Sequence, residues 1–413
     1  MERSSKIHTA SLAQFFISGV GVLAALSVMT GLAVMWIIAV MDVGISSPEA
    51  FLSVSLGWTS GVVIMLLLPS SALAFMRLIS REFPQQLRTY LGLKPSILPL
   101  ILLPLIWVSL LLAGEYLSHN PAIAWLFVPP LQVMVVSIPL WFWYQIARRG
   151  LSIGSHQRRW GLISFGLVVS PALILFAELL LVGFLAVVFA AWLVSQPGMV
   201  EELNRLSMRL ASSQMNPEVV MRILRPYLES PGVLYSILAV VAGLIPLLEE
   251  LLKPLGVWAL ARRLKTPGEG FIAGLLCGGM FALLENLGML ASPVTQGWAE
   301  LVIGRTGTGL LHMVTSGFVG WGLVLAWRKR NYVSLVGAYM LAVFLHGLWN
   351  MTSVFMAVEM LFPDGEVGSE FLTVMGQAGP WFIGILSLVL LMMLYTANRR
   401  LNSQANRKIE LFQ

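Results

Sequence analysis

Charged residues and cysteine are both scarce in this chain of 413 residues. Only 11% of the residues are charged, whereas about a quarter are charged in an average soluble protein. So few charges cannot cover a water-exposed surface, and the composition therefore excludes a soluble enzyme and a disordered chain. Cys277 is the single cysteine, which excludes a disulfide framework and a cysteine-based metal site.

Long apolar runs make up most of the chain, and 57% of the residues are hydrophobic. A helix that crosses a bilayer needs about 20 consecutive apolar residues. We therefore predict an all-α fold, a polytopic transmembrane helical bundle of about ten spans in the cell membrane. The predicted spans are residues 15–41, 53–76, 97–117, 121–147, 161–194, 232–261, 270–291, 307–327, 334–358 and 378–397.

The basic residues predict the orientation of this bundle. Lys and Arg outnumber Asp and Glu by 26 to 20, and most of them fall in loops on one side, such as Arg148–Arg149 and Arg328–Arg330. Basic residues collect in cytoplasmic loops, so we expect both termini in the cytoplasm and no nucleic-acid partner. The first apolar run lacks a small-residue cleavage site, and we expect a signal anchor that stays attached.

One outer loop, residues 196–231, is long and mixed in charge, with apolar residues at helical spacing. It predicts one or two amphipathic helices on the outer membrane surface, or else a small folded cap between spans. The loop separates a five-span region, residues 1–195, whose role the sequence leaves unassigned, from a second membrane region, residues 232–398. Residues 399–413 are expected to form a cytoplasmic tail.

Ionisable residues inside the membrane are concentrated in the second region. A charged side chain at mid-bilayer costs about 2.5 to 3.5 kcal/mol, so such residues must face a protein interior or a wet cavity. Four of these residues lie about 20 to 24 Å from the cytoplasmic end of their helix, namely Glu249, Glu285, His312 and His346. Their common depth predicts one site slightly outside the midplane. The intramembrane residues are Glu249, Glu250, Lys253, Glu285, His312 and His346.

Small residues predict where two of these helices meet. Gly270, Gly274 and Gly278 repeat every four residues, and such a stripe lets another helix approach closely. Glu285 lies on nearly the same face, so we expect it near that contact.

Charge balance suggests two kinds of chemistry. With all three glutamates ionised and Lys253 protonated, the region would hold a net negative charge that desolvation opposes. Lys253 lies within reach of Glu249 or Glu250. Either the carboxylates share protons or a cation binds. A glutamate can take a proton from water while histidines stabilise the oxyanion; alternatively, His312, His346 and a glutamate form a zinc site with an open position for water.

Four motifs follow one another on consecutive spans within residues 232–358. The motifs are Glu249-Glu250-Leu-Leu-Lys253, Phe281-Ala-Leu-Leu-Glu285-Asn286, His312 about two turns after Arg305, and His346-Gly-Leu-Trp349-Asn350. Singly each is weak, but in this order they resemble the PrsW family of bacterial intramembrane proteases, which is related to the CAAX prenyl endopeptidases. The family commonly has Asp-Gly where this chain has Glu269-Gly270.

The resemblance implies a hydrolase, an intramembrane endopeptidase that cuts membrane-anchored proteins such as anti-sigma factors near the outer face of a bacterial cytoplasmic membrane. Family members are classed as metalloproteases or as glutamate proteases, so a zinc cofactor stays open, with His312, His346 and Glu285 as ligands if zinc is used. The resemblance implies that Glu249 activates the water and that His312 makes a second contact to it. His346 and Asn350 are implied to stabilise the oxyanion, and Glu285 is implied as a further catalytic residue. The implied supporting residues are Glu250 and Lys253, which give electrostatic support, together with Asn286 and Arg305.

Other interpretations remain open. The polar residues could form a hydrogen-bonded network that only holds helices together, and Arg305 at the outer end of its span is more typical of a lipid-headgroup anchor than of a substrate clamp. A proton- or ion-coupled transporter also places acids and histidines at the midplane, although transporters usually show polar breaks in both halves. A catalytically inactive scaffold is the third class, and the complete set of motifs argues against it.

Overall fold

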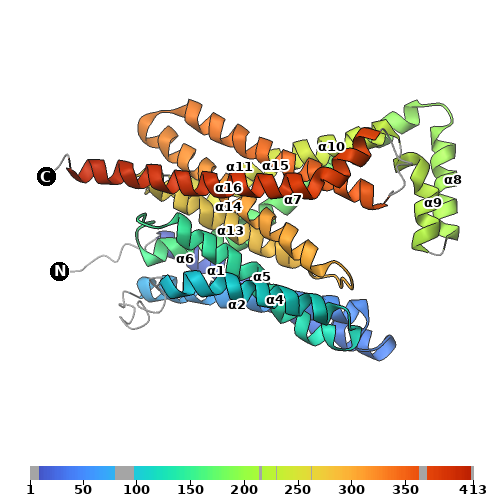
Figure 1. Cartoon of the computed structure of the whole chain (residues 1–413), viewed down its shortest axis with the longest axis horizontal. Coiled ribbons are helices and arrows are strands. Elements are labelled where there is room, and N and C mark those ends of the chain that lie inside the picture. The colour runs from blue at the N-terminus through green and yellow to red at the C-terminus, as the bar shows by residue number, and fades with distance from the viewer. Residues whose placement is uncertain are drawn as a thin grey trace. The chain divides into compact units, whose positions relative to one another are not determined.

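The computed structural model describes residues 9–79, 97–213, 216–228, 230–261, 263–361 and 370–410. Throughout these ranges the regular elements are helices, without a strand. Ten helical segments are long and apolar enough to cross a membrane, which confirms the predicted all-α bundle (Figure 1). The helices are α1 (Thr9–Asp42), α2 (Pro48–Leu78), α4 (Ile97–Ser118), α5 (Pro121–Ala147), α6 (His156–Ser164), η1 (Phe165–Val169), α7 (Ser170–Ser195), α8 (Met199–Ser212), α9 (Pro217–Leu228), α10 (Pro231–Leu238), η2 (Ala239–Leu244), α11 (Ile245–Leu252), α12 (Leu255–Ala259), α13 (Pro267–Met289), α14 (Trp298–Lys329), α15 (Tyr332–Leu361) and α16 (Glu370–Glu410).

The chain divides into two compact units, each built from separate stretches of sequence. Unit 1 takes residues 1–172, 250–342 and 385–413, and unit 2 takes residues 173–249 and 343–384. The division falls inside α11, between Glu249 and Glu250, so one short helix contributes residues to both units. The functional division predicted at residues 196–231 stays a prediction.

The centre of unit 1 is the antiparallel pair α13 and α14. Over their most apolar stretches, 83% of the α13 residues and 89% of the α14 residues are buried. A Cβ atom on Gly270, Gly274 or Gly278 would overlap a backbone carbonyl oxygen of α14. The absence of side chains at these three positions therefore permits the close packing of the two helices, which confirms the predicted glycine stripe.

The N-terminal helices of unit 1 support this pair. α1 packs on α2, and α4 packs on α5, with the four helices side by side in Figure 1. The Gln132 side chain of α5 donates a hydrogen bond to the Leu290 carbonyl at 2.6 Å. The Glu115 carboxylate of α4 accepts one from the Ala299 N–H at the start of α14, at 2.7 Å. Helices α4 and α5 thus each bond to one end of the α13–α14 connection.

Two spans contain a π-helical turn. η1 interrupts the span formed by α6 and α7, and η2 interrupts the span formed by α10, α11 and α12. Each turn is followed two residues later by a proline, Pro171 after η1 and Pro246 after η2. Proline has no N–H, and its ring clashes with the carbonyl four residues earlier. These two effects explain why the bonding departs locally from the α-helical pattern at both places.

Unit 2 has its own apolar contacts. Leu234 of α10, Phe355 of α15 and Leu372 of α16 form a buried cluster, with partly buried neighbours that include Leu238 and Met375. Helix α10 therefore meets α15 and α16, which follow much later in the sequence, through apolar side chains whose burial stabilises the unit.

The segment predicted to be amphipathic forms two helices, α8 and α9, which lie side by side at the right of Figure 1. The Tyr227 hydroxyl of α9 lies 3.2 Å from the Glu202 carboxylate of α8. None of the residues of α8 is buried within the protein. Residues 214, 215 and 229 of the predicted segment lie outside the described ranges, and its placement on the outer membrane surface stays a prediction.

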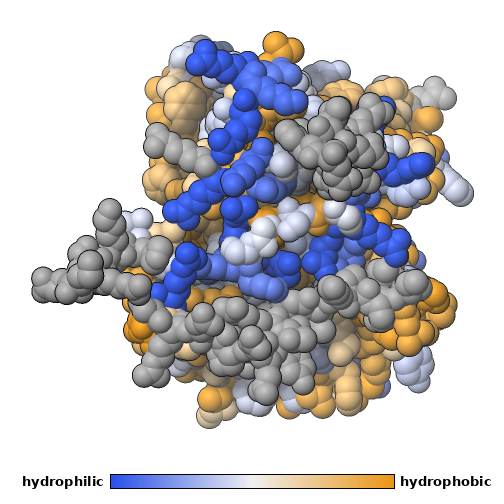
Figure 2. All heavy atoms as spheres, turned by 90° about the vertical axis from the view of Figure 1, so that its left-hand side faces the viewer, coloured by the Kyte–Doolittle hydropathy of each residue, from blue (hydrophilic) through white to orange (hydrophobic). Residues whose placement is uncertain are grey.

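Basic side chains gather at one end of unit 1, where hydrophilic residues are concentrated (Figure 2). Arg158 pairs with Glu269 at 3.2 Å and Arg328 donates to the Leu264 carbonyl at 2.8 Å. Asn402 of α16 donates to the Arg149 carbonyl at 2.7 Å, so the end of α16 lies at this same face. The predicted tail is helical up to Glu410, and residues 411–413 lie outside the described ranges. The cytoplasmic assignment of this face stays a prediction.

Candidate functional site

The residues predicted to form one site fall into two groups, one in each unit. α11 carries members of both groups, because Glu249 belongs to unit 2 and Glu250 to unit 1. Consecutive residues of an α-helix point about 100° apart, so the two carboxylates face different surroundings. The group in unit 1 is Glu250, Lys253, Glu285, Asn286, Arg305 and His312, and the group in unit 2 is Glu249, His346 and Asn350.

Lys253 is the centre of the unit 1 group. Its Nζ lies 2.8 Å from Glu250 Oε1 and 2.7 Å from His312 Nδ1. The Lys253 and Glu250 side chains are both completely buried. The Phe281 ring lies under the ammonium group, with 4.7 Å between Nζ and the ring centroid. A buried ammonium thus has a countercharge, a hydrogen-bond acceptor and an aromatic face, which together offset its desolvation.

His312 uses both ring nitrogens. A protonated lysine can only donate, so Nδ1 accepts from Lys253 and the ring proton of the neutral imidazole is assigned to Nε2. Nε2 lies 2.6 Å from Glu285 Oε2, within ion-pair distance. His312 therefore connects the carboxylate of α13 to the lysine that follows α11.

Arg305 fixes the end of α13. Its Nη2 lies 2.6 Å from Glu285 Oε1, and its Nε donates to Asn286 Oδ1 at 2.8 Å. Asn286 Nδ2 donates back to the Arg305 carbonyl at 2.9 Å. The sequence favoured a lipid-headgroup anchor at this position, but the Arg305 side chain is only 14% exposed. The reason is that α14 begins at Trp298, so Arg305 lies two turns inside the helix.

Glu249 and His346 lie close together in unit 2. Ligand atoms of the two side chains lie within 4.8 Å of each other. Both residues are buried, with 8% of Glu249 and 3% of His346 exposed. A carboxylate and an imidazole at this separation can share a water molecule, or can bind one metal ion together.

Asn350 lies one helical turn after His346 and contacts η2. Its Nδ2 donates to the Val241 carbonyl at 2.9 Å. A Cβ atom on Gly347 would overlap the Ala242 carbonyl oxygen. Asn350, the third residue of the unit 2 group, is thus hydrogen-bonded to the backbone of the π turn that precedes Glu249.

The donor types of unit 2 fit a zinc ion, because zinc takes imidazole nitrogen and carboxylate oxygen as ligands. Glu285, predicted as the carboxylate ligand, is held by Arg305 and lies close to His312. Glu249 instead lies beside a histidine within its own unit. The unit 2 pair is therefore the better start of a metal site.

The sequence indicated most of these residues but missed two. Phe281 stands out in the sequence only as the first residue of a motif, although its ring contacts Lys253 and lies edge-on to His312 with 5.2 Å between ring centroids. Pro246 belongs to none of the motifs, although it lies between η2 and Glu249. A proline inside a membrane span was the available signal for a local break in the helix.

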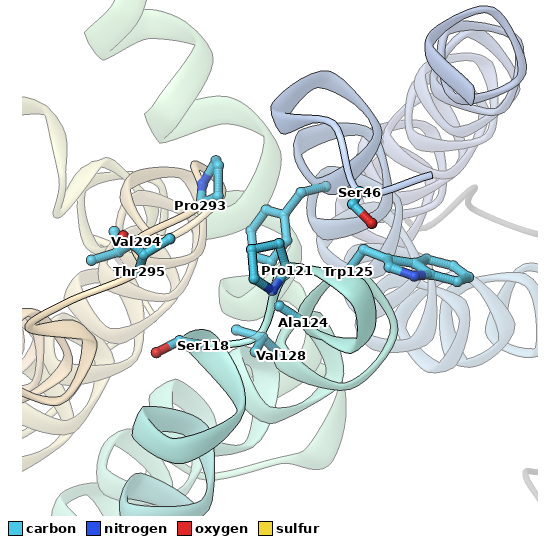
Figure 3. A pocket seen from close by; sticks show the side chains of 10 residues that line it. Ser46, Ser118, Pro121, Ala124, Trp125, Val128, Pro293, Val294 and Thr295 are labelled. Atoms are coloured by element: carbon cyan, nitrogen blue, oxygen red, sulfur yellow. The ribbon is translucent and has the colours of Figure 1, made fainter. Parts of the chain in front are cut away.

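A separate pocket in unit 1 does not contain this chemistry. Figure 3 shows the pocket, which residues from the start of α5 and from the α13–α14 connection help to line. Its lining residues include no acid, base or metal-ligating side chain, so it is not a candidate for acid–base or metal chemistry. The pocket is lined by Ser46, Phe51, Ser118, Pro121, Ala124, Trp125, Val128, Pro293, Val294 and Thr295.

Comparison with known proteins identifies the family. The model of the PrsW family of intramembrane metalloproteases matches residues 170–377, just over half of the chain, and this segment contains every predicted site residue. No curated protein and no solved structure matches the chain. The ten apolar helices and this match together show that the chain belongs to the PrsW family of intramembrane metalloproteases.

Proposed function

We propose that this protein is an intramembrane endopeptidase that hydrolyses peptide bonds of membrane-anchored proteins. The observation that carries the proposal is the buried pair of Glu249 and His346 within the matched segment. Burial of an acid and a base inside a membrane helix bundle has a high cost, and function is the usual reason for such residues.

The roles of the unit 2 residues follow from their chemistry. Glu249 accepts a proton from the attacking water, and His346 stabilises the negative charge that develops on the peptide oxygen. When bound, zinc would lower the pKa of its water and polarise the peptide carbonyl; Glu249 and His346 would hold it, and Glu249 would then be a ligand rather than the base.

The unit 1 residues hold the neighbouring charges in place. Lys253 neutralises Glu250, and Arg305 keeps the Glu285 carboxylate in a fixed position at the end of α13. These pairs keep the net charge of the buried unit 1 group low.

The substrate class is the one that the family resemblance implies, and the depth predicted for the site agrees with its side of the membrane. We expect single-span membrane proteins, cut near the outer face of a bacterial cytoplasmic membrane. The test compares protein N-termini in membranes of cells that make the wild-type chain or Glu249→Gln at equal levels. New N-termini within or beside single-span segments are expected with the wild type and are absent with Glu249→Gln, because glutamine cannot take a proton from water.

Glu201→Gln is the matched control, because Glu201 is an exposed acid on α8 in the same matched segment. This variant is expected to yield the wild-type set of N-termini. If Glu249→Gln, correctly inserted, still produced that set, the proposed role of Glu249 would be wrong. If the wild type produced no new N-termini in cells supplied with candidate single-span proteins, the protease proposal itself would fail.

Zinc binding gives a second prediction. Purified protein in detergent is expected to bind one zinc ion per chain, and His346→Ala should weaken binding by more than about 100-fold, since loss of a direct ligand exceeds the usual effect of an outer partner. His156→Ala, at the start of α6, is the control and should leave the affinity unchanged. Equilibrium dialysis with zinc measures this directly. Equal zinc affinity in all three proteins would exclude His346 as a ligand and leave the glutamate mechanism.

A further inference from the structure

Pro246 creates a gap in the hydrogen-bond ladder of the helix that carries Glu249. Proline has no N–H, so one carbonyl of the preceding turn loses its usual donor. In η2 the bonds run over five residues, and the Ile245 N–H donates to the Val240 carbonyl. In that register the next carbonyl, that of Val241, would require the N–H of residue 246, which proline does not have.

Asn350 supplies a donor at this position. Its Nδ2 lies 2.9 Å from the Val241 oxygen, and the bond is partly buried. The approach of α15 to η2 is possible because residue 347 is glycine; a Cβ atom there would overlap the Ala242 carbonyl oxygen. Gly347 and Asn350 thus contact two successive carbonyls of the same π turn.

The same two helices carry the reactive pair. Glu249 lies three residues after Pro246, and His346 directly precedes Gly347. The contact between α15 and η2 therefore determines both the path of the backbone into Glu249 and the approach of His346 to it. Ligand atoms of these two side chains lie within 4.8 Å.

We propose that Asn350 is a positioning residue, whose amide replaces the N–H missing at Pro246 and so holds the π turn that places Glu249 beside His346. The proposal rests on the proposed function, because it concerns the placement of the proposed catalytic glutamate. It assigns the amide to the backbone of Val241 rather than to the oxyanion of the substrate, the role that the sequence resemblance implied for Asn350.

Pro246→Ala offers a specific rescue. Alanine restores the N–H at residue 246, which can bond within the helix whether the turn stays π-helical or becomes α-helical. The Asn350 amide is then no longer needed to cover the gap. If instead the amide contacts the substrate, restoring an N–H at residue 246 cannot compensate for its loss.

The test uses the purified full-length chain in lipid nanodiscs and measures amide hydrogen exchange over residues 239–250. Asn350→Ala is expected to raise exchange in this segment at least about tenfold, since a buried carbonyl loses its donor. Asn350→Asp is a second variant of equal shape that lacks the amide donors. The double variant Pro246→Ala/Asn350→Ala should return exchange to within about threefold of the wild-type rate.

Ser353→Ala is the matched control, because the Ser353 hydroxyl lies on α15 but bonds only to the Trp349 carbonyl of its own helix among the contacts described. It should leave exchange in residues 239–250 unchanged. Unchanged exchange in Asn350→Ala and Asn350→Asp, or a rise that Pro246→Ala does not reverse, would overturn the proposal. An equal rise in Ser353→Ala would also overturn it, because the effect would then reflect general loosening of α15.

A cleavage measurement separates positioning from direct catalysis. With any substrate that the wild type cuts and Glu249→Gln does not, Asn350→Ala should lose cleavage and the double variant should regain most of it. Loss of cleavage in both would show that the amide acts on the substrate and would contradict positioning. The exchange experiment needs no substrate, so failure of the protease proposal leaves the test of the η2 contact intact.

Discussion

Replacing Lys253 with methionine is expected to lower the free energy of unfolding by about 3–5 kcal/mol, because it leaves the Glu250 carboxylate buried without its countercharge. Both side chains of the pair are completely buried, and their polar atoms lie 2.8 Å apart. The variant also removes the donor to His312 Nδ1. The measurement is unfolding of the purified protein in mixed micelles with increasing SDS, followed by circular dichroism.

A double variant shows how much of this loss comes from the ion pair. Lys253→Met/Glu250→Gln removes both charges, and we expect it to recover more than half of the stability that Lys253→Met loses. Lys265→Met is the control, because Lys265 is exposed in the connection before α13, and its effect should stay within about 0.5 kcal/mol. If Lys253→Met cost no more than this control, Glu250 would carry its own proton in the fold and the ion pair would not exist.

The second large effect is expected at the contact between α13 and α14. Gly274→Leu should lower the free energy of unfolding by about 3 kcal/mol or more, since a side chain there must displace the backbone of Ser316. Backbone cannot move aside as a flexible side chain can, and both helices are buried on most sides. The same SDS titration measures the change.

Gly288→Leu is the matched control on the same helix. A Cβ atom on Gly288 meets no atom within 4 Å, and leucine has a higher helix propensity than glycine, so this change should be neutral or stabilising by up to about 1 kcal/mol. Similar losses at the two positions would show that the glycine stripe does not determine the packing of α13 on α14. The contact matters for the site because Gly278 lies against the backbone of His312.

The sequence alone was sufficient to predict the spans and to name candidate site residues. A bilayer requires about 20 apolar residues per helix and leaves no backbone group unbonded, so the length of each apolar run is enough to predict a helix. The same cost of intramembrane charge singled out Glu249, Glu285, His312 and His346 before any contact was known. The glycine stripe was equally predictable, because a repeat of four residues stays on one face of a helix.

The partners of these side chains were not predictable in the same way. Helical spacing left Lys253 within reach of Glu249 or Glu250, and the structure shows the Glu250 pair. Arg305 was expected near the lipid headgroups because its predicted span began at residue 307, but α14 begins at Trp298 and directs Arg305 to Glu285. Spacing along one helix defines a face, whereas a contact also depends on the helix opposite.

The sequence by itself therefore determined that this chain is a bundle of ten membrane helices carrying the motifs of a PrsW protease. Only the tertiary structure decided which side chains of the motifs contact one another and in which direction they point, and the π turn η2 shows why. One extra residue in a helical turn rotates the remainder of the helix by about 100°, so the direction of Glu249 depends on where the chain leaves α-helical bonding. Pro246 favours such a break. The contacts of Asn350 with Val241 and of Gly347 with Ala242 determine where in the helix it lies.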